Sequence, residues 1–174
     1  MGAVDKMTIG ELLVGNVTGF ADLGRKAGTG DIADSDAAQT IALADCGKLF
    51  KSALDGASKT VTLPVFDRPG QTIDIVLTAA LVASGVLTLN LGSGQTFDTG
   101  SRAFFTAGSS TATLSFAAAT NNKLTLTGAA TNNSTALGST VSFVYLGENK
   151  VRCVAEGLKT GTGLNAALAF GTQA

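Results

Sequence analysis

Apolar and polar residues alternate along most of the chain after residue 38. Large apolar side chains occupy every second position in residues 73–77, 87–91 and 141–145. Successive side chains of a β-strand point to opposite faces, so this period is typical of strands that bury one face. The pattern predicts strands over residues 40–44, 48–51, 59–63, 72–77, 86–91, 103–106, 111–116, 123–127, 139–146 and 150–155.

Turn-forming residues separate these strands at short intervals. Asn121-Asn122 and Gly147-Glu148-Asn149 stand between predicted strands, and Asn and Gly tolerate the backbone angles of tight turns. Many short strands with a turn signal about every ten residues are typical of β-sandwiches and jelly rolls. We therefore expect a single all-β domain built as an antiparallel β-sandwich or jelly roll. Residues 36–51 are ambiguous, because Asp36-Ala37-Ala38-Gln39 could also cap a helix.

The first 38 residues lack this alternation and form a separate segment of the prediction. Thr8 and Glu11 have the spacing of a capping box, which predicts a short helix over residues 12–14. Residues 24–36 are typical of an extended linker. We divide the chain into an N-terminal arm, residues 1–38, and a β-sandwich body, residues 39–174. The larger apolar residues of the arm are expected to contact a partner: Met7, Ile9, Leu12, Leu13, Val14, Val17, Phe20 and Leu23.

Charged residues are scarce and unevenly distributed. They make up 14% of the chain, against about 25% in a typical domain. Residues 75–147 contain only Asp98, Arg102 and Lys123. Such a surface is either covered with Ser, Thr and Asn or buried by other subunits, which predicts a homo-oligomer. The arm contains three basic and six acidic residues, a net charge of −3, while the whole chain carries −1; this balance predicts no nucleic-acid partner.

The two cysteines, Cys46 and Cys153, do not form the dense framework of a small secreted protein. We expect both to be buried thiols, and a single bridge between them is the less favoured alternative. Asp5 and Glu11 interrupt any early signal-peptide run, and no apolar stretch is long enough to span a bilayer. We therefore expect a protein without membrane contact that is assembled in a cytoplasm.

The chain contains no histidine, which excludes Ser-His-Asp and Cys-His catalysis and histidine metal sites. The loop at Gly92 lacks the Gly-Lys-Ser/Thr of a phosphate loop. Asp31, Asp34, Asp36 and Asp45 do not have EF-hand spacing, so no metal ligands are assigned. No catalytic residue and no cofactor is expected.

A small hydrolase is the least favoured function. Its paired carboxylates would have to come from Asp67, Asp74, Asp98, Glu148 or Glu156. Sugar-cleaving enzymes usually bind their substrate on aromatic platforms, and this chain has no Trp and one Tyr. The prediction is that the protein is not an enzyme.

Two stretches carry a resemblance to a known group of proteins. Residues 40–50, which end in Asp45-Cys46-Gly47-Lys48 and a short strand, precede Thr60-Val61-Thr62-Leu63-Pro64; residues 124–154 contain a long strand that turns into a closing strand. This arrangement resembles the small β-modules of tailed-bacteriophage virion proteins, which include head decoration proteins and fibre modules. Such modules often have a Trp in the last strand, where this chain has Arg152 and Cys153.

The resemblance implies a structural virion protein that decorates or cements a bacteriophage capsid. Its partners would be the major capsid protein and copies of itself, as a homotrimer. The alternative that it implies is a tail-fibre or head-fibre receptor-binding module. In that case the loops at residues 92–100 and 129–138 would contact host glycans.

Overall fold

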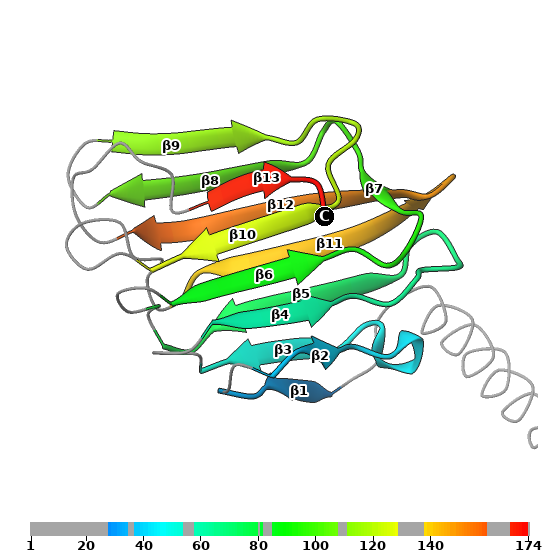
Figure 1. Cartoon of the computed structure of the whole chain (residues 1–174), viewed down its shortest axis with the longest axis horizontal. Helices are drawn as coiled ribbons and strands as arrows, with labels where there is room; N and C mark the ends of the chain where they lie inside the picture. The colour runs from blue at the N-terminus through cyan, green and yellow to red at the C-terminus, as the bar shows by residue number, and fades with distance from the viewer. Residues whose placement is uncertain are drawn as a thin grey trace, which may run out of the picture.

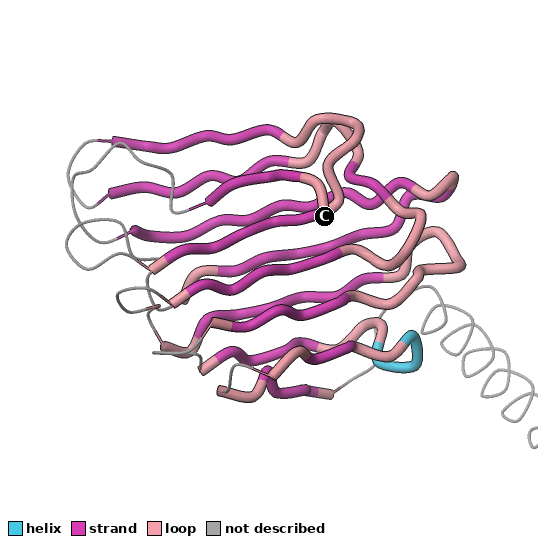
Figure 2. The backbone as a smooth tube through the Cα atoms, in the orientation of Figure 1, coloured by secondary structure: helices cyan, strands magenta, loops and turns pink. Residues whose placement is uncertain are grey.

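The protein folds into two β-sheets that pack face to face (Figure 1). The computed structural model describes residues 28–34, 37–53, 58–79, 81, 85–107, 111–128, 138–159 and 168–173. Strands fill most of the described trace in Figure 2, and the helical part of the described ranges is a single 3-10 turn. The prediction of an all-β sandwich is confirmed.

The larger sheet has eight strands. Across the sheet their order is β1 (Thr29–Ile32), β3 (Leu49–Ser52), β5 (Thr72–Leu77), β11 (Thr140–Gly147), β12 (Lys150–Lys159), β8 (Arg102–Ala107) and β9 (Thr111–Phe116). The short strand β7 (Thr96–Phe97) pairs with the beginning of β12. Strands β1 and β9 therefore form the two edges of this sheet.

The smaller sheet has five strands and lies in front of the larger one in Figure 1. Their order is β13 (Leu168–Gly171), β10 (Lys123–Thr127), β6 (Val86–Asn90), β4 (Lys59–Thr62) and β2 (Gln39–Thr40). A 3-10 turn, η1 (Leu43–Asp45), follows β2. The strands of both sheets run in similar directions in the view, which is the aligned packing of a sandwich.

Both sheets are mixed, which differs from the antiparallel pairing that the sequence suggested. From β1 to β6 the chain changes sheet after every strand, so β1, β3 and β5 are neighbours in one sheet and β2, β4 and β6 are neighbours in the other. Each of these neighbouring pairs is parallel. A chain that crosses to the other sheet and then returns re-enters its first sheet in the original direction. The prediction assumed that consecutive strands are joined by hairpins.

Hairpins do occur in the second half of the chain. Strands β8 and β9, and β11 and β12, are consecutive and antiparallel. The turn between β11 and β12 is formed by Glu148 and Asn149, with φ angles of 51° and 59°, and Gly147 pairs with Lys150 across it. Two residues with positive φ match the right-handed twist of the flanking strands. The predicted turn at Gly147-Glu148-Asn149 is confirmed.

The core fills the space between the sheets. Its members come from the inward positions of alternating strands, such as Ile73, Ile75 and Leu77 of β5, all at most 1% exposed. The Phe97 ring stacks on Phe143, with ring centroids 6.4 Å apart, and meets the edge of Phe170 of β13 at 5.1 Å. The alternation read from the sequence therefore corresponds to burial of one face of each sheet.

Three described strands were not predicted: β1, β7 and β13. Residues 29–32 were assigned to the linker of the arm, but they pair with β3 as an edge strand of the body. In the ambiguous segment of residues 36–51 the predicted strand at 40–44 is reduced to β2 and followed by η1. The short helix predicted over residues 12–14 lies outside the described residues.

Candidate interaction surfaces

The outer face of the smaller sheet is built from hydroxyl and amide side chains. The outward positions of β4, β6 and β10 stand opposite one another, with neighbouring strands about 4.8 Å apart; Val86, opposite Thr127, is apolar. One row across the three strands consists of Thr60, Thr88 and Thr125, and the next row of Thr62, Asn90 and Lys123. All six are partly buried by their neighbours. The face is therefore a continuous layer of half-buried side chains.

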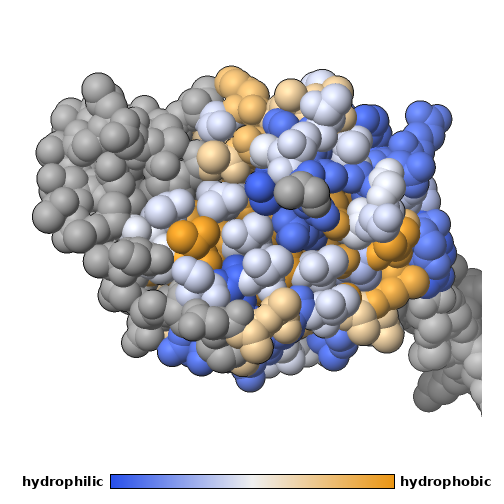
Figure 3. Space-filling model, in the orientation of Figure 1, coloured by the Kyte–Doolittle hydropathy of each residue, from blue (hydrophilic) through white to orange (hydrophobic). Residues whose placement is uncertain are grey.

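This face has little charge. Among the described outward positions of the smaller sheet, Lys123 carries the one charged group. Figure 3 looks onto this sheet and shows much of it in pale colours, near the middle of the hydropathy scale. Threonine places a methyl group beside its hydroxyl, so such a surface can contact a partner without desolvating charges.

The outer face of the larger sheet has a different chemistry. Charged residues stand on several of its strands, and two phenylalanines are exposed near the edge strand β9. Phe104 of β8 is 40% exposed and Phe116 of β9 is 61% exposed. Arg102 faces Phe116 across the two strands, and Glu156 of β12 faces Phe104 on the other side. We call Arg102, Phe104, Phe116 and Glu156 the phenylalanine patch.

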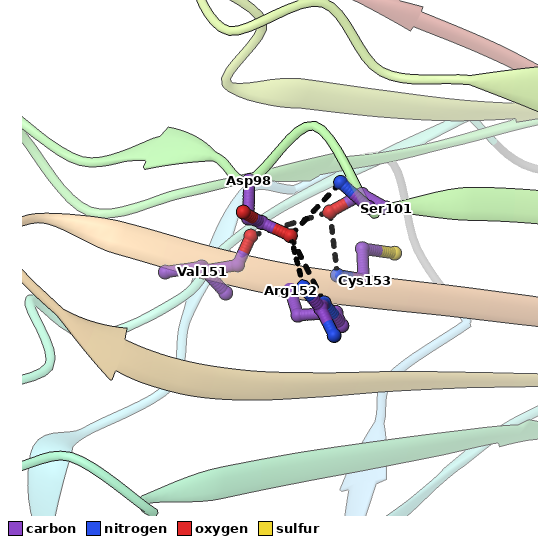
Figure 4. Close-up of polar contacts among 6 residues, drawn as sticks. Asp98, Ser101, Val151, Arg152 and Cys153 are labelled. Carbon is purple, nitrogen blue, oxygen red and sulfur yellow. Dashed lines mark hydrogen bonds and ion pairs between the residues drawn. The ribbon is translucent and has the colours of Figure 1, made fainter.

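A four-residue break between β7 and β8 is held against β12 (Figure 4). The Ser101 hydroxyl donates to the Val151 carbonyl at 3.3 Å and accepts from the Cys153 amide at 2.9 Å. These bonds are buried, so they satisfy backbone groups that water cannot reach. They fix the position at which β8 begins, and with it the phenylalanine patch.

Asp98 holds the outer side of the same break. Arg152 donates from Nε and Nη2 to Asp98 Oδ2 at 2.9 and 2.6 Å, and the Gly100 amide donates to the same oxygen at 2.9 Å. The hydrogen bonds from Arg152 lower the pKa of the Asp98 carboxyl, and partial desolvation acts in the opposite direction. A Cβ atom on Gly100 would lie 2.8 Å from both Asp98 Oδ2 and Arg152 Nη2. A side chain at position 100 would therefore have to displace the ends of this ion pair.

Both cysteines are buried, and neither forms a disulfide. Cys153 is fully buried in the core, and this burial raises the pKa of its thiol. Cys46 is 7% exposed, next to an ion pair in which Lys48 Nζ lies 2.6 Å from Asp45 Oδ1. The prediction of two buried, unbridged thiols is confirmed.

The partner-contact residues predicted in the arm all lie outside the described residues. These are Met7, Ile9, Leu12, Leu13, Val14, Val17, Phe20 and Leu23. Within the described ranges, no three His, Cys, Asp or Glu side chains form a group that could hold a metal ion. The described part of the chain also contains no helix long and apolar enough to cross a membrane.

The phenylalanine patch was not identified from the sequence, although a signal for it exists. Phe104 and Phe105 are consecutive in a strand, and consecutive strand residues point to opposite faces, so one of the two must face outward. The alternation alone could not tell which face of the strand was the core.

Comparison with known proteins gives no relative from which a function could be transferred: no family model, no curated protein and no solved structure matches this chain.

Proposed function

We propose that the protein is a structural component of a bacteriophage particle that decorates or cements the capsid shell by bridging neighbouring capsid subunits. The proposal rests on the outer face of the smaller sheet, together with the resemblance of residues 40–64 and 124–154 to phage virion modules. It assigns the chain a contact surface and no reaction.

The threonine rows suit a repeated protein contact. Threonine is branched at Cβ and has few rotamers, so little side-chain entropy is lost when a partner covers it. Only Lys123 on this face would have to be desolvated or paired. Each contact would be modest, but a cement protein that touches more than one shell subunit gains from multivalency.

The test is to purify the particles of the phage that encodes this chain and to measure where the protein lies and how many copies are present. Many copies over the shell, and a shell that is less heat-resistant when the gene is deleted, are the expected results. A few copies confined to the tail would overturn the proposal and favour the fibre module.

Substitutions locate the contact. Thr60→Lys, Thr88→Lys and Thr125→Lys together place three charges on the smaller sheet and are expected to lower occupancy of the shell. Thr99→Lys, Thr120→Lys and Thr140→Lys together, at exposed positions outside the smaller sheet, are the matched control and should bind normally. Leu12→Ser, Leu13→Ser and Phe20→Ser in the full chain test whether the arm contributes to attachment, as the sequence predicts. If the triple variants of the smaller sheet and of the arm both bind like the unmodified protein, neither surface makes the contact.

A further inference from the structure

We infer that the phenylalanine patch is the surface through which two copies of this chain associate. This inference goes beyond the proposed role, which assigns the chain a contact with the shell and none with itself, and its two-fold contact differs from the homotrimer that the resemblance implies. It names the face of the larger sheet at β8, β9 and β12 as the contact and the same face of a second copy as its occupant.

The apolar centre of the patch is formed by Phe104 and Phe116. Arg102 is directly opposite Phe116, and Phe104 is two residues further along β8, so the two rings lie on one face as diagonal neighbours. They are 40% and 61% exposed. Aromatic side chains, phenylalanine included, are enriched at protein interfaces, where burial of their large apolar area favours association.

Opposite charges stand next to this centre, on the neighbouring strands β8 and β12. Arg102 precedes Phe104 on β8, and Glu156 faces Phe104 from β12. Both are exposed, and neither side chain makes a hydrogen bond or an ion pair with the described part of the chain. Their positive and negative groups are available to a partner.

This arrangement of charges is complementary to itself. When two patches meet around a symmetry axis close to Phe104, Arg102 of one copy comes next to Glu156 of the other copy. The same residues then supply both halves of the contact, as symmetric oligomers require. A partner with a surface of one sign would satisfy only one of the two charges, whereas a second copy satisfies both. Charge complementarity therefore favours a second copy as the occupant.

The geometry of the edge is also suitable. Strand β9 is the last strand of its sheet, so no further strand of the described chain screens Phe116 from an approaching molecule. The other edge of the same sheet, β1, lies on the opposite side of the molecule (Figure 1). A contact through the patch therefore leaves the smaller sheet open for the shell.

The test is sedimentation of the full-length protein and of charge-reversed variants over a range of concentrations. Arg102→Glu and Glu156→Arg each place like charges opposite one another and should raise the dissociation constant about tenfold or more. The double variant, Arg102→Glu with Glu156→Arg, restores opposite charges and should associate like the unmodified protein. Phe104→Ser with Phe116→Ser should raise the constant about 100-fold.

The matched control uses another pair of opposite charges on the same sheet. Asp31 of β1 faces Lys51 of β3, and both are exposed. Asp31→Lys and Lys51→Glu should leave association unchanged. Circular dichroism verifies that each variant folds. If the serine variant does not fold, the charge reversals still test the inference, because they alter exposed groups only.

Three outcomes would overturn the inference. The unmodified protein could remain monomeric at all concentrations, the reversals at positions 102 and 156 could leave association unchanged, or the double variant could fail to recover it. These experiments need no phage particle, so their failure is distinct from a failure to bind the shell.

Discussion

The two halves of the sandwich reach similar sheets by different routes. Strands β1 to β6 alternate between the sheets. Two strands that are neighbours in one sheet are therefore separated along the chain by a strand of the other sheet. Strands β8, β9, β11 and β12 instead form hairpins in which neighbours follow one another directly. In the half formed by β1 to β6, which we call the wound half, the crossing loops determine which strands meet. In the half formed by β8, β9, β11 and β12, the hairpin half, short turns determine it.

The crossing loops of the wound half are therefore fixed by specific interior contacts. The buried Gln95 side chain, which follows β6, accepts a hydrogen bond from the Phe66 amide at 3.2 Å and donates to the Phe66 carbonyl at 2.8 Å. Phe66 lies in the loop that carries the chain from β4 to β5. Gly92 lets the same two loops touch, because a Cβ atom there would lie 2.7 Å from the Val65 backbone. One amide thus joins the β4–β5 crossing to the loop that follows β6.

Breaking this link should have the largest effect on stability. Gln95→Ala leaves the amide and carbonyl of Phe66 without a partner at a site where Gln95 is 1% and Phe66 2% exposed. A buried polar group without a hydrogen bond costs about 1 to 3 kcal/mol, so we expect a loss of about 2 to 4 kcal/mol for the pair. Urea unfolding of the full chain measures it.

Gln39 provides a control with the same chemistry in a different environment. Its side chain accepts from the Ala33 amide at 3.2 Å and donates to the Asp31 carbonyl at 2.9 Å, near the surface. Water can replace these bonds, so Gln39→Ala should cost about 0.5 to 1.5 kcal/mol. If Gln95→Ala and Gln39→Ala lower the free energy of unfolding equally, the interior location of Gln95 does not explain the stability of the wound half.

A smaller effect is expected at the turn of the hairpin half. Asn149 has a φ of 59°, a conformation that costs most residues with a Cβ about 1 to 2 kcal/mol. Asn149→Ala should destabilise the protein by about 1 kcal/mol, whereas Asn149→Gly should change the stability little. Thermal unfolding of both variants gives the comparison, and a glycine variant as unstable as the alanine variant would contradict the conformational explanation.

The smallest effect is expected at the Asp98 and Arg152 ion pair. Its side chains are 23% and 47% exposed, and such surface pairs contribute about 0.2 to 1 kcal/mol. The folded pKa of Asp98 is lowered, so its contribution is present at neutral pH and is lost as the pH falls through that pKa. Asp98→Asn should therefore be slightly less stable at pH 7, and the difference should vanish in acid.

Asp74 supplies the control for this pH dependence. Its side chain makes no ion pair with the described part of the chain, and Asp74→Asn removes the same charge from the outer face of the larger sheet. A pH-dependent difference of the same size for both variants would assign the effect to net charge and not to Arg152.

The sequence predicted strands well where the alternation was strong. Strands β5, β9 and β10 have the predicted bounds, since their apolar positions recur at every second residue. Strands β1 and β7 were missed for a physical reason. Thr29-Gly30-Asp31-Ile32 contains one large apolar residue, and β7 has only two residues, so neither carries a readable period.

The pairing of the strands could not be predicted from the same pattern. Alternation shows that Ile73 and Ile75 face a core, but it does not show which strand lies beside them. That choice depends on contacts between distant residues, such as Gln95 with Phe66, and nothing local marks them. The exposed faces were equally hidden, because Ala103, Phe104 and Phe105 are consecutive apolar residues and give β8 no alternation that marks its outer face.

The alternate winding of β1 to β6 also has a mechanical consequence. A tensile force applied at Gly28 acts first on β1, but β1 leads to β2 in the other layer and β2 leads back to β3. The load therefore passes through both layers at each step, and neither can peel away while the other stays intact. A strand pair that shears along its length must also break its parallel hydrogen bonds together instead of one at a time. We expect this half of the molecule to resist stretching from its N-terminal side more strongly than the hairpin half resists stretching from β9.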